Sequence, residues 1–450
     1  MTSTGKKSMA NTSNYSTNAF QELKNETKRN PPFLFFILAV LSIPMPYAVN
    51  GIAVGLFALV TVISCKKSNI RIERSLVFPI LLYLLMALSL VWSHDREATT
   101  RAISKVLPLL VLPVCFIIGP KYSLNQKRKI MMFYSYGILL YCIFYLLKAL
   151  VTYFRTQDFS VFFYHNLVTE DVNAIHVSIY AALAFFWFFT KNTKRLADKL
   201  AMFLMATFIV LLSSKNVIFV LVLLIIFYEI FYYKATQNIK WITLGLLVLL
   251  SATMLFSGKI RDRFLVEFRS NQQEGTLNTD FGPQGQVYNV SIKQAWEKEH
   301  FQQNEYFPGA AFRVYQFRIF TEMLAEDPIF FTGYGLNATD FRIEQKGLEH
   351  TIFSGNAENE GYQKKNFHNQ YVQLFAETGV FGFLLLLVIV FLNLKNAFKT
   401  KDFVHISFAI LMISLFLTES FLARQRGVVF FAAIYCLFNS GIAMKFRDKE

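Results

Sequence analysis

The chain has 450 residues, of which 54% are hydrophobic, only 17% are charged, and 49 are phenylalanine. A water-soluble protein of this length needs far more charged side chains to cover its surface. The composition therefore excludes an ordinary soluble domain and predicts an integral membrane protein.

Apolar runs long enough to cross a membrane recur along the chain. A transmembrane helix needs roughly 20 apolar residues, and the weak strand-like alternation argues against a β-barrel. The sequence therefore predicts an all-α polytopic fold with about 12 transmembrane helices. The predicted spans are 33–48, 50–65, 77–93, 103–119, 130–152, 173–190, 198–213, 216–233, 241–257, 379–395, 403–418 and 427–444.

The net charge of +15 could suggest a nucleic-acid partner, so the position of the basic residues matters. With the N-terminus in the cytoplasm, the inner segments carry 25 Lys and Arg, whereas the short outer segments carry 6. This asymmetry follows the positive-inside rule. The charge is therefore interpreted as a topological signal. No nucleic-acid partner is expected, and both termini are predicted to be cytoplasmic.

Four regions are predicted in chain order. Residues 1–32 are polar, show no convincing cleavage site, and are interpreted as a disordered cytoplasmic tail. Residues 33–257 contain helices 1–9, residues 258–378 form one large periplasmic loop with short helices, and residues 379–450 contain helices 10–12 and a cytoplasmic tail. The four cysteines lie in or beside spans, so no disulfide framework is expected.

The first half of the loop shows three local patterns. Residues 271–287 are rich in Gly, Asn and Gln and are predicted to be mobile, and residues 288–303 are compatible with a short helix. Residues 313–326 place apolar side chains at helical spacing, and Asp327-Pro328 ends that pattern. The sequence therefore predicts a loop helix that Arg313 opens.

The second half of the loop leads back to the membrane. A turn is predicted at Gly333-Tyr334-Gly335. From His368 onward, apolar residues fall on one helical face, and Gly379 opens the tenth span. We therefore expect a helix at the membrane surface, starting at His368.

Three cationic or titratable residues on the outer side are candidate site residues. Lys215 follows two serines at the start of a span, where it is either a membrane-interface anchor or an anion contact. Arg313 is either a surface arginine or a phosphate ligand, a role that suits its planar guanidinium. His368 is either an ordinary polar loop residue or a proton-transfer group, because imidazole titrates near neutral pH.

Metal and nucleotide sites are poorly supported. The outer segments contain no Asp-x-Asp pair, and no zinc signature, phosphate-cradling glycine loop or nucleophile elbow is present. No metal is therefore expected.

Residues 368–382 read HNQYVQLFAETGVFG. This segment resembles the HN-x-Y/F-x-x-x-x-x-E-x-G-x-x-G signature of the O-antigen ligase and polymerase superfamily. Looser matches to the same superfamily are the Arg-led helix at Arg313, the Asp327-Pro328 stop, the Gly333-Tyr334-Gly335 turn before Phe341, Trp92-Ser93-x-Asp95, and Glu419-Ser420.

The resemblance implies an inverting, metal-independent glycosyltransferase in the bacterial inner membrane. Such an enzyme moves a glycan from undecaprenyl diphosphate to lipid A–core, or to another glycan or protein acceptor, on the periplasmic face. It implies that His368 is the general base or orients the acceptor hydroxyl, and that Arg313 binds the diphosphate. Lys215 stands where many relatives have arginine, so it keeps the charge but loses the bidentate fork. No cofactor is expected, because the donor carries its own leaving group.

Three alternatives stay open at this point. A polysaccharide polymerase and a protein O-glycosylation ligase belong to the same superfamily and share the expected chemistry. A non-enzymatic polysaccharide transporter is a different class. The absence of an internal repeat and the few charges inside the predicted spans argue against the transporter.

Overall fold

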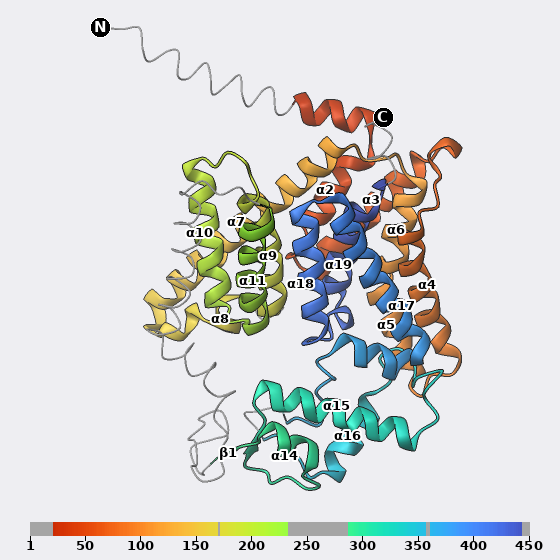
Figure 1. Ribbon diagram of the computed structural model, residues 1–450, viewed down its shortest axis with the longest axis vertical. Helices are drawn as coiled ribbons and strands as arrows, with labels where there is room; N and C mark the ends of the chain where they lie inside the picture. Colours follow the sequence, from red (N-terminus) through yellow and green to blue (C-terminus); the bar gives the residue numbers. More distant parts are fainter. Residues whose placement is uncertain (1–20, 170–171, 233–286, 357–360, 443–450) are drawn as a thin grey trace.

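The apolar runs of the sequence form helices, as they must where lipid offers no hydrogen-bond partner to the backbone. The computed structural model describes residues 21–169, 172–232, 287–356 and 361–442 (Figure 1). The helices of the bundle are α2 (Pro32–Leu41), α3 (Tyr47–Ile63), α4 (Arg74–Leu88), α5 (Arg96–Val106), α6 (Pro108–Ile118), α7 (Leu124–Thr156), α9 (Ala174–Phe189), α10 (Leu196–Leu211), α11 (Lys215–Phe231), α17 (Gln370–Thr400), α18 (Phe403–Phe416) and α19 (Gln425–Asn439).

Some of these helices are long and apolar enough to cross a membrane on their own. In the described part of the chain these are Arg74–Val91, Arg96–Ile118, Leu124–Thr156 and Gln370–Thr400, and several shorter apolar helices accompany them. The prediction of a helical membrane protein is therefore confirmed. The predicted span 241–257 and the mobile stretch predicted at 271–287 lie outside the described residues, except for residue 287.

The structure differs from the predicted spans at the first helix. The sequence predicts one span over residues 33–48, but α2 ends at Leu41 and α3 begins at Tyr47. Pro44 and Pro46 lie between them, and proline lacks the N–H that a continuing helix needs. The first helix is therefore shorter than predicted, and the second, predicted over residues 50–65, begins three residues earlier, at Tyr47.

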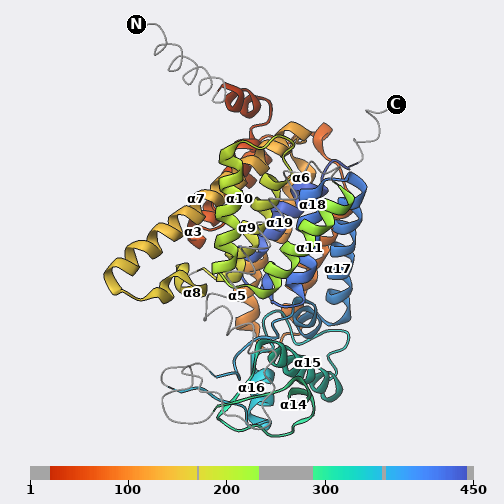
Figure 2. The same cartoon turned by 60° about the vertical axis from the view of Figure 1, so that its left-hand side comes forward.

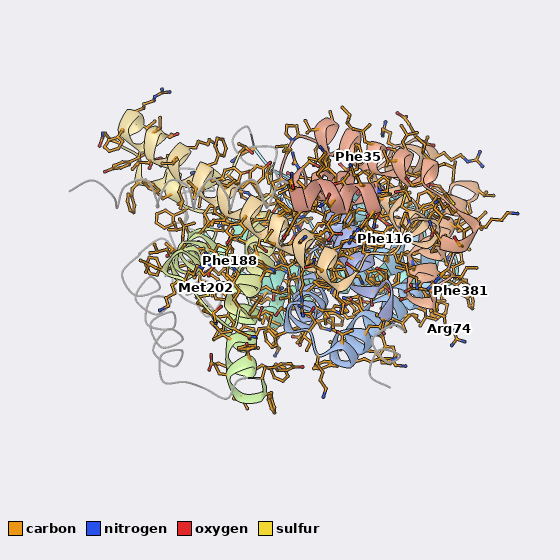
Figure 3. All side chains as sticks on the ribbon, turned by 90° about the horizontal axis from the view of Figure 1, so that it is seen from above. Phe35, Arg74, Phe116, Phe188, Met202 and Phe381 are labelled. Carbon is orange, nitrogen blue, oxygen red and sulfur yellow. The ribbon has the colours of Figure 1, made fainter. Side chains whose placement is uncertain are left out.

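The centre of the bundle is formed by helices that are buried on all sides, α9 and α19. A helix that is apolar around its whole circumference must pack against other helices rather than face water. Aromatic rings fill the space between them, as in the contact of Tyr180 with Phe430 at 4.7 Å between ring centroids. The view along the bundle in Figure 3 shows Phe116 and Phe188 among the packed side chains and Arg74 at the edge.

The loop forms a folded unit at one end of the bundle (Figures 1 and 2). It contains β1 (Tyr288–Asn289), α14 (Ile292–Glu297), β2 (Glu305–Tyr306), α15 (Gly309–Glu326) and α16 (Asp340–Glu349), and β1 pairs with β2 in parallel. The unit has an apolar core of its own, which includes Tyr315, Ile319 and Met323.

Three predictions for the loop need correction or extension. The helix expected within 288–303 covers only α14, because a capping box of Ser291 and Gln294 starts it and Lys298 is already extended. The helix α15 begins at Gly309, one turn before Arg313, since Ala310 and Ala311 favour helix. The helix α16 was not predicted.

A tight backbone crossing attaches the loop unit to the bundle. Residues 330–335 run across a break in α17 at Gly379, where φ is +67°. The backbone N–H groups of Tyr334 and Gly335 donate to the carbonyls of Ala376 and Glu377, both at 2.8 Å. A Cβ at Gly379 would lie 2.2 Å from the carbonyl oxygen of Phe331, so only glycine permits this approach.

Candidate active site at the junction of loop and helices

Three segments far apart in the sequence meet at this junction. They are α15, the turn that leads into α17, and residues 418–420 after α18. Each segment contributes one charged or titratable side chain, namely Arg313, His368 and Glu419. The junction lies at the loop-bearing end of the bundle, below α18 and α19 in Figure 1.

His368 lies in a strained turn rather than inside a helix. Its φ is +47°, a left-handed conformation that non-glycine residues rarely adopt. The side chains of the neighbouring asparagines stabilise this turn: Asn366 accepts from the His368 N–H at 3.0 Å, and Asn369 accepts from the Tyr371 N–H at 3.0 Å. The helix α17 therefore begins at Gln370, two residues after the predicted start, and His368 precedes it.

Glu419 joins the two predicted site residues. Its Oε1 lies 3.2 Å from Nη2 of Arg313, and its Oε2 lies 3.3 Å from Nδ1 of His368. The Glu419 side chain is 13% exposed, whereas those of Arg313 and His368 are 33% and 31% exposed. A mostly buried carboxylate thus holds two side chains that remain accessible.

The guanidinium of Arg313 is fixed by further hydrogen bonds. Its Nε and Nη2 donate to the Thr418 carbonyl at 3.0 and 2.8 Å, and its Nη1 donates to the Gly309 carbonyl at 2.9 Å. Arginine supplies several donors in a rigid fork, so these contacts set both its position and its plane. The result is a fixed positive charge beside His368.

Lys215 begins α11, and the first turn of this helix reaches the same junction. The Asn216 side chain donates to the Ser414 carbonyl at 2.9 Å and to Thr418 Oγ1 at 2.7 Å. Thr418 also provides the carbonyl that binds Arg313. The start of α11 is therefore tied to the segment that carries Glu419.

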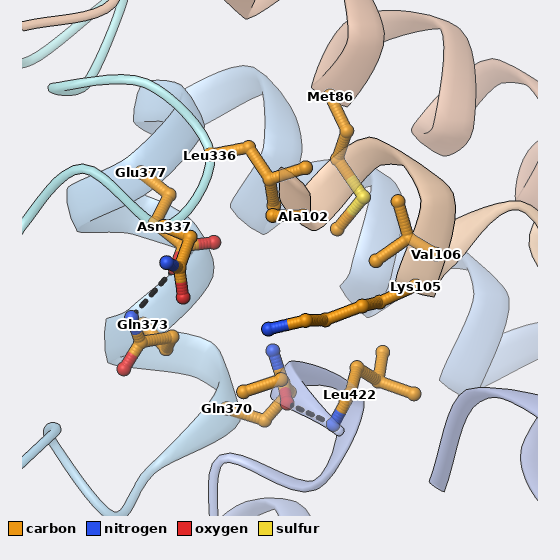
Figure 4. Close-up of a pocket in the computed structure, with 11 residues that line it drawn as sticks. Met86, Ala102, Lys105, Val106, Leu336, Asn337, Gln370, Gln373, Glu377 and Leu422 are labelled. Carbon is orange, nitrogen blue, oxygen red and sulfur yellow. Dashed lines mark hydrogen bonds between the residues drawn. The ribbon is translucent and has the colours of Figure 1, made fainter. Parts of the chain in front are cut away.

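Buried polar side chains of α17 form hydrogen bonds that hold the segment with Glu419. Ser420 Oγ donates to Gln373 Oε1 at 3.2 Å, and Gln373 Nε2 donates to Glu377 Oε1 at 2.7 Å. In α17, Gln370 Oε1 also accepts the Leu422 N–H at 2.6 Å. Figure 4 shows Gln370, Gln373 and Glu377 beside a narrow pocket, with Lys105 extending from α5 toward α17.

Sequence reasoning did not assign Glu419, Gln373 or Lys105 to a site. Glu419 was noted only as a loose motif match. Lys105 did carry a signal, because ionisable residues within apolar runs are rare and tend to be functional. Gln373 carried none, since a glutamine in a helix start has no distinctive spacing.

Ion pairs between α15 and α16 hold the loop unit in shape. Arg342 lies 2.7 Å from Glu326 and 2.8 Å from Asp327, and Lys346 lies 2.5 Å from Glu326. Burial disfavours the charged form of Lys346, but its bonds to Glu326 and Glu349 outweigh this and raise its pKa. Lys346 also lies 2.8 Å from Glu349 within α16, and this bond lowers the pKa of Glu349.

Within the described residues, no group of three or more His, Cys, Asp or Glu could hold a metal ion. The functional groups at the junction are instead an imidazole, a carboxylate and fixed cations. This set can orient a proton acceptor and stabilise developing negative charge.

The comparison with known families decides what kind of protein carries this junction. Residues 200–387 match a family model described as O-antigen ligase. This match supports the O-antigen ligase superfamily for that part of the chain. Lys215, Arg313 and His368 lie inside the matched region, and Glu419 lies beyond it. No curated protein matches the chain at a significant level.

This family match supports two broad statements. The protein is a membrane-embedded enzyme of the O-antigen ligase or polymerase type, and its chemistry is of the glycosyltransferase kind. The helical architecture agrees with this class.

Proposed function

We propose that this protein transfers a glycan from undecaprenyl diphosphate to lipid A–core or a similar surface acceptor. The observation that carries the proposal is the shared carboxylate of Glu419, which lies within 3.3 Å of both Arg313 and His368. An oriented imidazole beside a fixed cation suits a reaction in which a hydroxyl attacks and a diphosphate leaves.

In the proposed reaction, His368 is the general base. Its Nδ1–H faces Glu419, which fixes the tautomer that leaves Nε2 free to accept a proton. The acceptor oxygen attacks the anomeric carbon and gives its proton to Nε2, while the bond from that carbon to the diphosphate breaks. One displacement inverts the anomeric centre and releases undecaprenyl diphosphate.

The cations would stabilise the departing diphosphate. Arg313 holds a fixed guanidinium at the junction, and Lys215 begins the helix that is tied to Thr418. Preorganised charges are most effective where water is partly excluded. No metal or nucleotide takes part in the proposed step, because the donor is activated by its own leaving group.

The proposal includes a membrane topology. About 12 transmembrane helices leave the loop 258–378 on the periplasmic side of a bacterial inner membrane and both termini in the cytoplasm. The excess of basic residues in the opposite connections supports this orientation. The donor and the acceptor would then meet at the loop-bearing face.

A reconstituted assay tests the function. Purified protein in liposomes is given a lipid-linked glycan and an acceptor, and the transferred product is measured. His368→Ala should lower turnover by roughly 10²-fold or more, whereas His300→Ala, at an exposed histidine of the same loop unit, should not. Equal activity of wild type and His368→Ala would overturn the proposed site.

A polymerase of the same superfamily is the nearest alternative, and a deletion strain distinguishes it. Loss of a ligase leaves long glycan chains on the carrier and none on the core. Loss of a polymerase leaves single repeat units on the core. Modification of a protein acceptor in place of lipid A–core would indicate an O-glycosylation ligase.

A further inference from the structure

A large concavity lies at the end of the bundle opposite the loop unit. It is formed where α7 begins, where α9, α11 and α17 end, and where α18 begins, with a volume of about 760 Å³. These helix ends lie away from the loop unit in Figures 1 and 2. The concavity is therefore separate from the proposed transfer site, which lies at the other ends of α11 and α17.

Basic side chains line this concavity. They include Arg128, Lys129, Lys191 and Lys401. Lys129 lies 3.2 Å from Glu22, and Lys191 donates to Asp198 at 2.6 Å. Among the residues that the structure describes, Arg128 and Lys401 have no acidic partner within ion-pair distance, and both are exposed. Two positive charges are thus available to an anion at this end of the bundle.

Aromatic side chains form the rest of the wall. Trp187, Tyr228 and Tyr232 line the concavity, and Lys191 Nζ lies 4.1 Å from the centroid of a Trp187 ring. Trp and Tyr are enriched where transmembrane helices meet the polar headgroup layer, because their rings are amphipathic. A site with cations beside aromatic rings suits a ligand that joins a phosphate to hydrocarbon.

We propose that this concavity binds the headgroup of an anionic phospholipid. Arg128 and Lys401 would contact the phosphate, and Trp187 and Tyr232 would contact the glycerol and the first part of the acyl chains. Basic pockets between transmembrane helices bind anionic lipid headgroups through the same combination of charge and apolar surface. The position at the helix ends sets the pocket at the depth of one leaflet's headgroups.

Native mass spectrometry of the detergent-solubilised protein tests the site. Bound phosphatidylglycerol is counted against phosphatidylcholine at equal concentrations. Wild type should retain more phosphatidylglycerol, and the double variant Arg128→Gln/Lys401→Gln should bind it about tenfold more weakly. The control Lys66→Gln/Lys67→Gln removes two exposed cations from a connection at the same end, and should bind as wild type does.

Two further measurements test the proposed lipid site. Inorganic phosphate added in excess should not displace the lipid, because it lacks the part that contacts the aromatic wall. Acyl-brominated phosphatidylglycerol should quench the fluorescence of Trp187. The Trp187 signal is obtained by subtracting the fluorescence of Trp187→Phe from that of wild type. This measurement does not depend on the folding of the double variant. Equal binding of both lipids, an equal loss in the control, displacement by phosphate or no quenching of Trp187 would each overturn the proposal.

Discussion

Glu419 connects two side chains that would otherwise be independent surface groups. Its oxygens contact Nη2 of Arg313 and Nδ1 of His368, and its side chain is largely buried. Because one carboxylate serves both partners, a change in its charge affects the imidazole and the guanidinium together. In the proposed reaction Glu419 is a positioning residue, since it acts through His368.

The variant Glu419→Gln tests that role. The amide keeps the shape of the side chain but removes the charge that fixes the His368 tautomer, so kcat should fall by about 10²-fold or more. The donor KM should change less, because the carbonyls of Thr418 and Gly309 still hold Arg313. Glu419→Asp should retain part of the activity. A thermal midpoint near that of wild type controls for folding, and unchanged kcat in Glu419→Gln would contradict the positioning role.

Arg313 can act on the donor or on the chain segment that it holds. Arg313→Lys keeps the positive charge but loses the paired contact with the Thr418 carbonyl. If Arg313 binds the diphosphate, Arg313→Ala should raise the donor KM by roughly tenfold or more and Arg313→Lys by less. Donor titrations and thermal unfolding measure the two effects separately. A lower midpoint with an unchanged donor KM would show that Arg313 only anchors residues 418–419.

At the scale of elements, the site depends on how the loop unit attaches to α17. Residues 330–335 cross the break in α17 at Gly379. The same segment is also bonded to the chain after α4, because the Trp92 indole N–H donates to the Thr332 carbonyl at 2.9 Å. The first turns of α17, which carry Gln370 and Gln373, are thereby held against the segment with Glu419. The geometry of the site therefore depends on the attachment of the loop unit to α17.

Gly379→Ala should disrupt this attachment. The added Cβ would meet the Phe331 carbonyl and would force a side chain into φ +67°, a combined cost of at least about 1–3 kcal/mol. Gly441→Ala is a matched control, because Gly441 has the same φ but open space around it. Hydrogen exchange of residues 330–338 should rise in Gly379→Ala alone, whereas protection equal to that of wild type in Gly379→Ala would contradict the role of this crossing.

The loop unit that contains α15 and α16 should lose stability in acid. The Lys346 bond lowers the pKa of Glu349 below its ordinary 4.5, so this stabilisation is present above pH 4.5 and is lost as pH falls through the lowered value. Burial lowers the pKa of His350 below 6.5, although Glu322 opposes this, so the folded loop favours neutral His350 and loses stability as pH falls below 6.5.

Limited proteolysis of the loop between pH 7 and 4 measures this effect. Cleavage within α16 should increase as pH falls, after correction for the activity of the protease at each pH. His350→Gln should reduce the pH dependence below pH 6.5. Wild-type cleavage that does not change with pH would contradict a role of Glu349 and His350 in the stability of the loop unit.

At the scale of the whole molecule, the two functional regions occupy opposite ends of one bundle. The junction of Arg313, His368 and Glu419 lies at the loop-bearing end, and the basic concavity lies at the other. Since membrane-spanning helices connect the two ends, the proposed functions require that they face different sides of the membrane. This requirement is independent of the chemistry at either site.

Cysteine labelling in intact bacteria tests the orientation. A cysteine introduced by Glu299→Cys in the exposed part of the loop should react with a membrane-impermeant maleimide, because the loop is proposed to be periplasmic. Lys67→Cys, exposed in the connection before α4, should react only after the cells are permeabilised. Both variants are made in a Cys65→Ser background. The reverse pattern would contradict the proposed topology and place the site away from its donor.

The sequence by itself determined the helical membrane fold, the end of α15 at Asp327-Pro328 and the glycine turn at Gly333-Tyr334-Gly335. These features depend on local properties, namely apolar run length, the missing N–H of proline and the conformational freedom of glycine. Only the tertiary structure decided that Glu419 lies between Arg313 and His368, which are 106 and 51 residues away in the chain. It also decided that Arg313 lies one turn inside α15. Contacts of this kind depend on how distant segments pack, and no local pattern of residues contains that information.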